Sequence, residues 1–506
     1  MKKTLIAAAS TAFLLAGCST TETEKAAPNE NENEKKVLNT MESYDLLSVD
    51  PADAITSNIF NQIYEGLYRF DANNELVPAA AKSHSVSEDG KVYTFKLDQN
   101  AKWSDGKPVT AENFRYAYER VIETNSPFSY LLEPVKETKV IDDETLQIEL
   151  KRPTPYFLSM TTFGTYMPVR EDIVKAQGDK FGTDPETNVY NGPFTFKKYQ
   201  AEQGYTLAKN ADYADRKNVK IDEVDVKIIK DPMLAINLFE TGELDVAPLN
   251  SENVVTYKDQ KEYNTFSDSR MFFIRMNQKT EALQDQQTRQ AIDAAYDKKA
   301  LTETLLGNGS LPADYIVPQE LDPKYDKTRQ IEASFDATQA KQVLADQNLE
   351  LTMIIEDDDV SKKIGEYIQG SLKQQNVDVK LLSLPKKERL AREGRGDYDL
   401  SLASWAPDYQ DATTYLNLFM TGNPFNMMDY SNEQYDELLK QAENELDQDK
   451  RLELLSEAET MLLDDQAISP VYQRKNAFLQ NTEVKNLARH NVGTDISYKY
   501  VEIDRK

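Results

Sequence analysis

Apolar residues with two different spacings alternate along this chain, and no other feature limits more strongly what it can fold into. YTFKL at 93–97 places apolar side chains at every second residue, as a half-buried strand does. Phe114, Ala117 and Val121 lie three or four residues apart, on one face of a helix that Thr110 is suited to cap. Strands and helices that follow one another in this way predict an α/β fold.

The second half of the chain carries the same alternation with longer helices. Residues 194–228 predict a sheet of several strands, whereas beyond residue 272 single strands separate helices, as in βαβ units. The segments predicted there are a helix at 289–305, a strand at 349–355, a helix at 364–372 and strands at 377–381 and 399–403. About 470 residues follow the N-terminal segment. They exceed what one hydrophobic core usually holds, so we expect two or three lobes.

The N-terminus predicts export and lipid attachment. Two lysines precede an apolar run, residues 5–16, which is shorter than the ~20 residues of a membrane-spanning helix and typical of a signal peptide over residues 1–17. The run closes on LAGC, a bacterial lipobox in which Cys18 receives the lipid. Because Cys18 is the only cysteine, disulfides are excluded. Residues 18–36 contain no aromatic residue, and we expect a flexible tether there.

The composition favours binding over catalysis. The chain has 86 acidic and 59 basic residues, and its net charge of -27 makes nucleic acid an unsuitable partner. His84 and His490 are the only histidines and lie about 400 residues apart, so neither a zinc site nor a histidine-activated nucleophile is expected. The sequence has no Gly-rich phosphate loop and no GxSxG motif. We therefore expect no catalytic residue, no metal and no cofactor.

One carboxylate occupies an unusual position. In ASWAPDYQDATTYLN at 403–417, Asp408 lies between Trp405 and Tyr409, just after the strand predicted at 399–403. Any loop tolerates an aspartate, so the position alone does not assign a role. However, ligands of open α/β sheets are usually held beyond the carboxyl ends of the strands. The alternative is therefore that Asp408 binds a positive charge.

Several stretches resemble the oligopeptide- and dipeptide-binding proteins, the large solute-binding lipoproteins of peptide-importing ABC transporters. The resemblance extends from about Leu46 to the C-terminus. It is carried by IYEGLYRFD at 63–71, AKWSDGKPVTAENFRYAYERV at 101–121, YNGPFTF at 190–196 and SWAPDY at 404–409 with the YLNLFMTGN that follows. The nearest likeness is to the oligopeptide branch and its Gram-positive lipoproteins.

The resemblance implies a two-lobed α/β fold of the periplasmic-binding-protein type, a class II (cluster C) clamshell with an extra subdomain in its first lobe. Two chain crossings, near residues 272–275 and 470–473, would form the hinge. The implied divisions are 37–58, 187–272 and 473–506 for lobe I, 59–186 for the inserted subdomain, and 273–472 for lobe II.

The resemblance also implies a function and a site. The protein would capture oligopeptides in extended form between its closing lobes and deliver them to the transmembrane permease subunits of an ABC transporter. Asp408 would accept the α-ammonium group of the peptide, and the peptide main chain would pair as an added strand. The other residues that the resemblance implies at the ligand are Trp405, Ala406, Tyr409, Tyr130, Asn191, Gly192, Arg392 and Tyr472.

The sequence departs from this family at two positions. After the aromatic residue the family often has Asp-Pro, whereas this chain has Asp411-Ala412. Enteric oligopeptide binders carry an arginine three residues before the tryptophan, where this chain has Leu402. Arg392 matches a basic position of the family further upstream. These departures leave open how the carboxylate of the peptide is bound and which ligand length is preferred.

Other functions remain open at this stage. The same fold serves as a receptor for a signalling peptide, a nickel chelate, a sugar or another small solute, and the two histidines disfavour metal uptake. A secreted hydrolase or an adhesin belongs to a different class, and a hydrolase needs a nucleophile and base that the sequence does not offer. We expect a monomer, anchored by lipid on the outer face of the membrane of a Gram-positive cell.

Overall fold

The computed structural model describes residues 35–53, 57–124, 126–321, 324–325, 335–493 and 496–505. The predicted signal peptide, Cys18 and nearly all of the predicted tether lie outside these residues. Residues 36–506 form a unit separate from the segment that precedes them, and every element below belongs to that unit. None of the described helices has the length and apolar character needed to cross a membrane.

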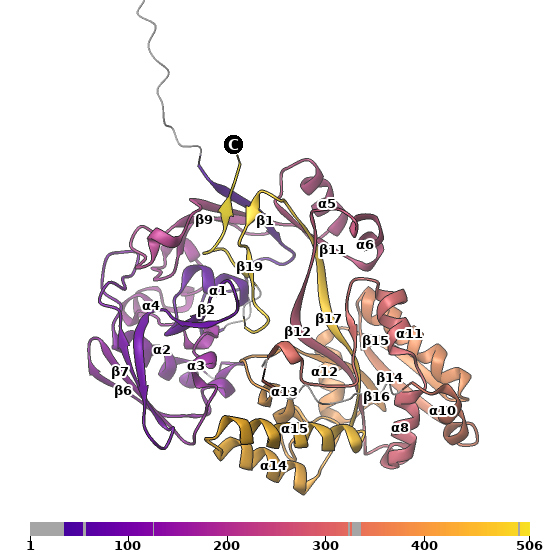
Figure 1. Cartoon of the computed structure of the whole chain (residues 1–506). Coiled ribbons are helices and arrows are strands. Elements are labelled where there is room, and N and C mark those ends of the chain that lie inside the picture. Colours follow the sequence, from indigo (N-terminus) through magenta and orange to yellow (C-terminus); the bar gives the residue numbers. More distant parts are fainter. Residues whose placement is uncertain are drawn as a thin grey trace, which may run out of the picture. The chain divides into compact units, whose positions relative to one another are not determined.

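Two long antiparallel strands, β12 (Tyr263–Met276) and β17 (Ile468–Gln480), run side by side (Figure 1). The two segments predicted to cross between lobes pair with each other here, since Phe272 lies opposite Tyr472 and Phe273 opposite Pro470. Around this pair a seven-stranded sheet has the order β11-β17-β12-β16-β14-β15, with β13 also beside β17. Its other strands are β11 (Val246–Leu249), β13 (Leu311–Pro312), β14 (Glu350–Glu356), β15 (Asp378–Leu384) and β16 (Leu400–Trp405).

The βαβ units predicted from the apolar spacing are confirmed. Strand β14 pairs in parallel with both β15 and β16, and α11 (Asp359–Gln374) connects β14 to β15. Asp358 caps α11, because its side chain accepts hydrogen bonds from the backbone N–H groups of Val360 and Ser361. The apolar face of α11 is buried, and α11 contacts β14 and β15. The parallel strands therefore direct the carboxyl end of β16 toward the loop that contains Asp408.

The helix predicted at 289–305 is interrupted. The chain forms α8 (Gln286–Ala294), a turn, the short α9 (Lys298–Ala300) and a π-helical segment, η6 (Leu301–Leu306). The interruption has a local cause, since the side chain of Asp297 accepts a hydrogen bond from the backbone N–H of Ala300 and starts a new helix. Gly307, with φ of 60°, then ends the segment in the left-handed region.

Two four-stranded sheets form the earlier part of the chain. One has the order β1-β10-β9-β8, which confirms the sheet predicted between residues 194 and 228, and the other has the order β4-β5-β7-β6. Thr110 is the N-cap residue of α2 (Ala111–Glu123), as predicted, and α2 packs on β6 and β7. The strands are β1 (Val37–Glu42), β10 (Glu223–Ile228), β9 (Gly204–Lys209), β8 (Phe194–Gln200), β4 (Ala81–Val86), β5 (Val92–Leu97), β7 (Thr145–Leu150) and β6 (Val135–Asp142).

Helices and short strands complete the described chain. The helices are α1 (Ser57–Ile63), α3 (Phe157–Met160), α4 (Glu171–Gln177), α5 (Pro232–Glu240), α6 (Ser251–Tyr257), α7 (Glu281–Gln284), α10 (Ala337–Leu344), α12 (Lys386–Arg395), α13 (Thr413–Leu416), α14 (Glu433–Asn444) and α15 (Gln448–Asp464). The short strands are β2 (Tyr68–Phe70), β3 (Leu76–Pro78), β18 (Val484–Lys485), β19 (Ala488–Arg489), β20 (Ile496–Ser497) and β21 (Glu502–Ile503).

The buried apolar side chains of the described residues fall into separate clusters. The largest spans the two four-stranded sheets, a second surrounds α13, α14 and α15, and a third lies between α8, α11 and the seven-stranded sheet. Tyr409, on the loop after β16, belongs to the first cluster, whereas Trp405 packs against the second. The loop that contains Asp408 therefore lies where two cores meet.

Gly192, in the turn before β8, is required by a close backbone approach. A Cβ atom at this position would lie 2.5 Å from the carbonyl carbon of Ile63 and 2.6 Å from the backbone nitrogen of Tyr64. The N–H of Gly192 donates to the carbonyl of Ile63 at 2.9 Å, and its own carbonyl accepts from Asn210 Nδ2 at 2.9 Å. Both polar backbone groups are thus used inside the protein.

We predict that Gly192→Ala destabilises the protein by about 1–3 kcal/mol, because the atoms that an added Cβ meets are backbone and cannot rotate away. Gly370→Ala is the matched control, since Gly370 is exposed in α11 with no atom within 4 Å of a Cβ. This control should be neutral or stabilising by up to about 1 kcal/mol. Thermal unfolding followed by circular dichroism checks both, and an unchanged Tm for Gly192→Ala would contradict the close approach.

Candidate functional site

The loop after β16 is held in place by its own side chains. The backbone N–H of Asp408 donates to the hydroxyl of Thr414 at 3.1 Å. Asp411 accepts from the backbone N–H of Thr413 at 3.0 Å and from both Nη atoms of Arg451, at 2.7 and 2.9 Å. Asp411 and Arg451 are both buried, so their bidentate pair anchors the loop on α15. Asp408 is consequently presented by a fixed backbone.

Residues from the stretch 59–186 reach this loop. The hydroxyl of Tyr130 donates to Oδ2 of Asp408 at 2.9 Å. The backbone N–H of Gln410 donates to the hydroxyl of Ser159 at 2.7 Å. The rings of Tyr409 and Tyr156 stack with centroids 4.6 Å apart and planes 8° from parallel. Two stretches that are distant in the sequence thus meet at Asp408.

A hollow of about 220 Å³ opens between these two stretches. The indole of Trp405 meets the ring of Phe425 edge-on at 5.0 Å, and its buried Nε1 has no hydrogen-bond partner among the described residues. The lining combines five aromatic side chains with several polar and charged ones, a mixture found in many ligand sites. The lining residues are Tyr130, Leu131, Glu133, Pro134, Arg152, Tyr156, Met160, Trp405, Asp408, Tyr409, Thr413, Thr414, Asn417, Leu418, Asn423 and Phe425.

Asp408 has an unusual charge environment. Burial raises the pKa of its carboxyl from the ordinary 3.8 to about 6, although the hydrogen bond from Tyr130 and the charge of Arg270 act in the opposite direction. The side chain keeps some solvent contact, but protein surrounds it on both sides of the hollow. In the part of the chain that the structure describes, no cation forms an ion pair with it. Such a carboxylate is suited to bind a cation from outside the protein or to take up a proton.

The structure brings four of the predicted site residues together and sets others apart. Asp408, Trp405, Tyr409 and Tyr130 line one hollow, and Ala406 is half-buried in the adjoining loop. Tyr156 and Phe425 complete the aromatic lining, and sequence reasoning did not find them. Both lie in irregular segments, Tyr156 just before α3, where neither apolar spacing nor a motif distinguishes them.

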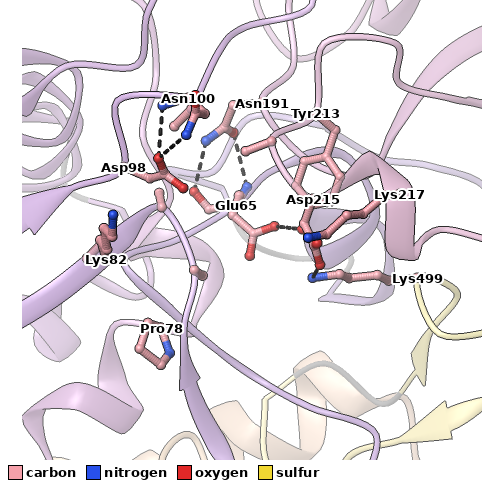
Figure 2. Close-up of a pocket in the computed structure, with 15 residues that line it drawn as sticks. Glu65, Pro78, Lys82, Asp98, Asn100, Asn191, Tyr213, Asp215, Lys217 and Lys499 are labelled. Atoms are coloured by element: carbon pink, nitrogen blue, oxygen red, sulfur yellow. Dashed lines mark hydrogen bonds and ion pairs between the residues drawn. The ribbon is translucent and has the colours of Figure 1, made fainter.

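Asn191 lines a different hollow, of about 390 Å³, shown in Figure 2, and Gly192 lines neither this hollow nor the one at Asp408. The side chain of Asn191 accepts from the backbone N–H of Glu65 at 3.0 Å and donates to its carbonyl at 2.9 Å. The carboxylate of Glu65 is bound in turn by Arg69, at 2.9 Å, and by the hydroxyl of Tyr213. None of the residues around this hollow lines the hollow at Asp408. Asn191 thus holds the local backbone.

Tyr472 and Arg392 do not line the hollow at Asp408 either. Tyr472 is only 2% exposed, stacks on Phe272 with centroids 4.4 Å apart, and belongs to the third core. Arg392 lies on α12, where its Nε is 3.1 Å from a carboxylate oxygen of Glu388. It lines a hollow near Asp399, at the opposite end of β16 from Trp405. No described group of three or more histidine, cysteine, aspartate or glutamate side chains is arranged to hold a metal ion.

Comparison with known proteins identifies the family. The model of the bacterial extracellular solute-binding proteins, family 5 (middle region), matches residues 75–427. The chain belongs to this family. The dipeptide-binding protein DppE of Bacillus subtilis (strain 168) is 32% identical over 523 residues, which cover 95% of each chain. The family's members are solute-binding receptors of the extracellular or periplasmic space.

Two solved structures place the fold in the same group. The substrate-binding domain of an oligopeptide ABC transporter from Bacillus anthracis str. Ames is 36% identical, with a TM-score of 0.79 over 93% of this chain and 99% of that chain. The pheromone receptor PrgZ, whose structure was solved to show its mode of peptide binding, is 32% identical. The TM-score is 0.79, and the match covers 93% of this chain and 100% of that chain. The predicted fold class, a two-lobed α/β protein of the periplasmic-binding-protein type, is confirmed.

We predict that Asp408→Asn stabilises the ligand-free protein at pH 8 but not at pH 4. The pKa of this carboxyl, about 6 in the folded protein, lies above its ordinary 3.8, so the folded state binds the proton more tightly. The stability that this tighter proton binding gives to the folded state is complete below pH 4 and is lost as the pH rises through 6. Removing the charge should therefore recover at most about 3 kcal/mol at pH 8.

Asp411→Asn is the control for this prediction. It removes a carboxylate three residues away, but it leaves Arg451 buried without its charged partner. It should destabilise the protein at pH 8 by about 3–5 kcal/mol. Thermal unfolding at both pH values measures the two variants. The assignment of Asp408 as an uncompensated charge would be wrong if Asp408→Asn melted below the unmodified protein at pH 8.

Proposed function

We propose that this protein is the receptor of a peptide-importing ABC transporter and binds oligopeptides in extended form between two closing lobes. The observation that carries the proposal is Asp408, a carboxylate without an ion pair among the described residues, at an aromatic hollow between two distant stretches of chain. Membership of family 5 and likeness to peptide-binding relatives support it.

In this proposal Asp408 binds the α-ammonium group of the peptide. An ammonium and a carboxylate about 4 Å apart attract by about 4 kcal/mol at an effective dielectric constant of about 20, before desolvation. As a charge-assisted hydrogen bond the contact keeps about 1.5–3 kcal/mol. Trp405 and Tyr409 would enclose the first residue, and Tyr130 would orient the carboxylate. Main-chain pairing of the remaining peptide would bind many sequences alike.

We further propose the division into lobes given by the resemblance. Residues 37–58, 187–272 and 473–506 form lobe I, residues 59–186 its inserted subdomain, and residues 273–472 lobe II. The pairing of β12 with β17 supports a hinge at these strands, because both crossings are adjacent there. A ligand that contacts both lobes would favour the closed state by its additional contacts. Ligand-induced compaction in small-angle scattering tests this division and would count against an adhesin.

We propose that the protein is a monomer, tethered to the outer face of the membrane through acyl chains on Cys18. The lipobox and the polar residues 19–36 support this proposal. The tether would let the receptor reach the transmembrane permease subunits. Membrane retention that depends on Cys18 is the property to measure. We propose no catalytic role, and turnover of peptides on incubation would overturn that.

A receptor for one signalling peptide is the second candidate. Likeness to the pheromone receptor PrgZ favours it, since the match covers 93% of this chain. The two functions differ in pocket selectivity rather than in fold. Mass spectrometry of peptides retained from a random mixture distinguishes them, because a nutrient receptor retains many sequences and a pheromone receptor retains one.

We predict that Asp408→Asn weakens binding of free-amine peptides at least tenfold at pH 7, a loss of a bit over 1.4 kcal/mol. N-acetylated peptides should bind poorly to both forms, because they lack the cation. The unmodified protein should also lose affinity below pH 6, as Asp408 takes up a proton, whereas the variant should not. Calorimetry across pH measures these affinities. Equal binding of an acetylated and a free peptide to the unmodified protein would refute the role of Asp408.

A further inference from the structure

Arg270 occupies a distorted part of β12; it does not line the hollow at Asp408, but its side chain reaches Ser404, the residue before Trp405. The pairing of β12 with β17 shifts register between Ser267 and Met271, and Ser269 has φ of 54°, a left-handed conformation that is uncommon outside glycine. The carbonyl of Ser269 accepts a hydrogen bond from the hydroxyl of Tyr415, which fixes the bulge. Met271, which follows Arg270, lies opposite Trp405 in the pairing of β12 with β16. The bulge therefore carries Arg270 to the end of β16.

The guanidinium of Arg270 is poorly satisfied by the protein. Its Nη1 has one long hydrogen bond, 3.4 Å to the hydroxyl of Ser404, and its Nε is buried without a hydrogen-bond partner among the described residues. The carboxylate paired with it belongs to Asp268, 3.9 Å from Nε, and Arg474 already binds that group. The side chain is 32% exposed, so a ligand can reach it. A guanidinium in this condition can bind another anion.

The Nε atoms of Arg451 and Arg275 are also buried without a hydrogen-bond partner among the described residues, but the terminal nitrogens of these two arginines are bound by carboxylates. Arg451 makes two short bonds to Asp411, and Arg275 is 2.9 Å from Glu393. Arg270 differs because its nearest carboxylate, that of Asp268, is also bound by Arg474. The terminal N–H groups of the Arg270 guanidinium therefore remain available to another group.

Arg270 and Asp408 carry opposite charges near the same site without pairing. The charge of Arg270 lowers the pKa of Asp408, and no ion pair joins the two side chains among the described residues. In the ligand-free protein each partly offsets the other. A peptide ammonium at Asp408 would neutralise the carboxylate and leave the arginine as the uncompensated charge. An anionic group on the same peptide would restore the balance.

We propose that Arg270 binds a carboxylate of the peptide, close to the amino end that Asp408 holds. This inference rests on the proposed peptide-receptor function. The carboxylate has two possible sources, the C-terminus of a short peptide or an acidic side chain near the N-terminus of a longer one. In both cases the guanidinium presents two parallel donors to the two oxygens. Arg270 would then select acidic or short peptides from the pool that the main-chain contacts admit.

Calorimetry with two matched pairs of free-amine peptides tests this proposal in the full chain. The first pair is Ala-Ala-Ala and its C-terminal amide, and the second is Ala-Glu-Ala-Ala-Ala and Ala-Gln-Ala-Ala-Ala. The unmodified protein should prefer the carboxylate-bearing member of at least one pair by at least tenfold. In Arg270→Gln that preference should disappear, while affinity for the neutral member changes less than threefold. The pair that shows the effect identifies the source of the carboxylate.

Two controls separate this inference from the function on which it rests. Arg270→Lys should keep part of the preference, because a point charge remains, and equal melting temperatures would show that the variants fold. If neither pair is discriminated, or if Arg270→Gln weakens both members equally, the carboxylate role is overturned. Should Asp408→Asn still weaken free-amine peptides tenfold, the receptor function survives that result. Failure of the unmodified protein to bind any of the four peptides would overturn both.

Discussion

The pairing of β12 with β17 is the constraint on which the other features of the structure depend. These strands contain both segments where the chain crosses between the proposed lobes, and they also anchor the seven-stranded sheet. Register shifts between Ser267 and Met271 and between Phe272 and Phe273 interrupt the ladder just before and within the proposed crossing at 272–275. A regular ladder would place Arg270 in line with its neighbours, whereas the bulge directs it to the end of β16. The backbone geometry of the proposed hinge thus also positions Arg270 beside Ser404.

Charge pairing distinguishes the site from its surroundings. Arg451 with Asp411, Arg275 with Glu393 and Arg69 with Glu65 are buried pairs with N–O distances of 2.7–2.9 Å. Asp408 lacks such a partner and Arg270 has only a shared one. Uncompensated charges reduce stability, and groups with perturbed pKa values cluster at functional sites because binding requires them there. Asp408 and Arg270 therefore reduce the stability of the folded protein and, in the proposed function, bind the ligand.

Much of the fold follows from the sequence because apolar spacing reports burial directly. The strands around residues 93–97, 194–228 and 349–381 were predictable in this way. The predicted helix at 289–305 failed because one side chain, Asp297, competes for a backbone N–H and starts a new helix. Such local hydrogen bonds leave apolar spacing unchanged, so periodicity does not detect them.

The site was less predictable than the fold. Asp408 could be singled out because it follows a strand and lies between aromatic residues. Tyr472 and Asn191 came from resemblance alone, and the structure surrounds Tyr472 with core residues and Asn191 with the backbone of Glu65. The only sign of Arg270 in the sequence is that an arginine precedes the apolar run MFFI. Its proposed role depends on the bulge in β12 and on Asp268, which Arg270 shares with Arg474. A contact that depends on Arg474, about 200 residues further along the chain, cannot be read from spacing.

At Ala412, where the family often has proline, side-chain contacts restrict the backbone in place of a proline ring. Proline would stiffen the backbone after Asp411 by fixing φ. Here Asp411 accepts from the backbone N–H of Thr413 and makes two bonds to Arg451, and the Tyr409 ring stacks on Tyr156. Side-chain contacts therefore restrict the loop where the chain lacks a proline. The bonds of Asp411 hold the loop on α15 without any help from residues 59–186. The stack of Tyr409 on Tyr156 adds a contact with that stretch, so the position of Asp408 is restricted from both sides of the hollow.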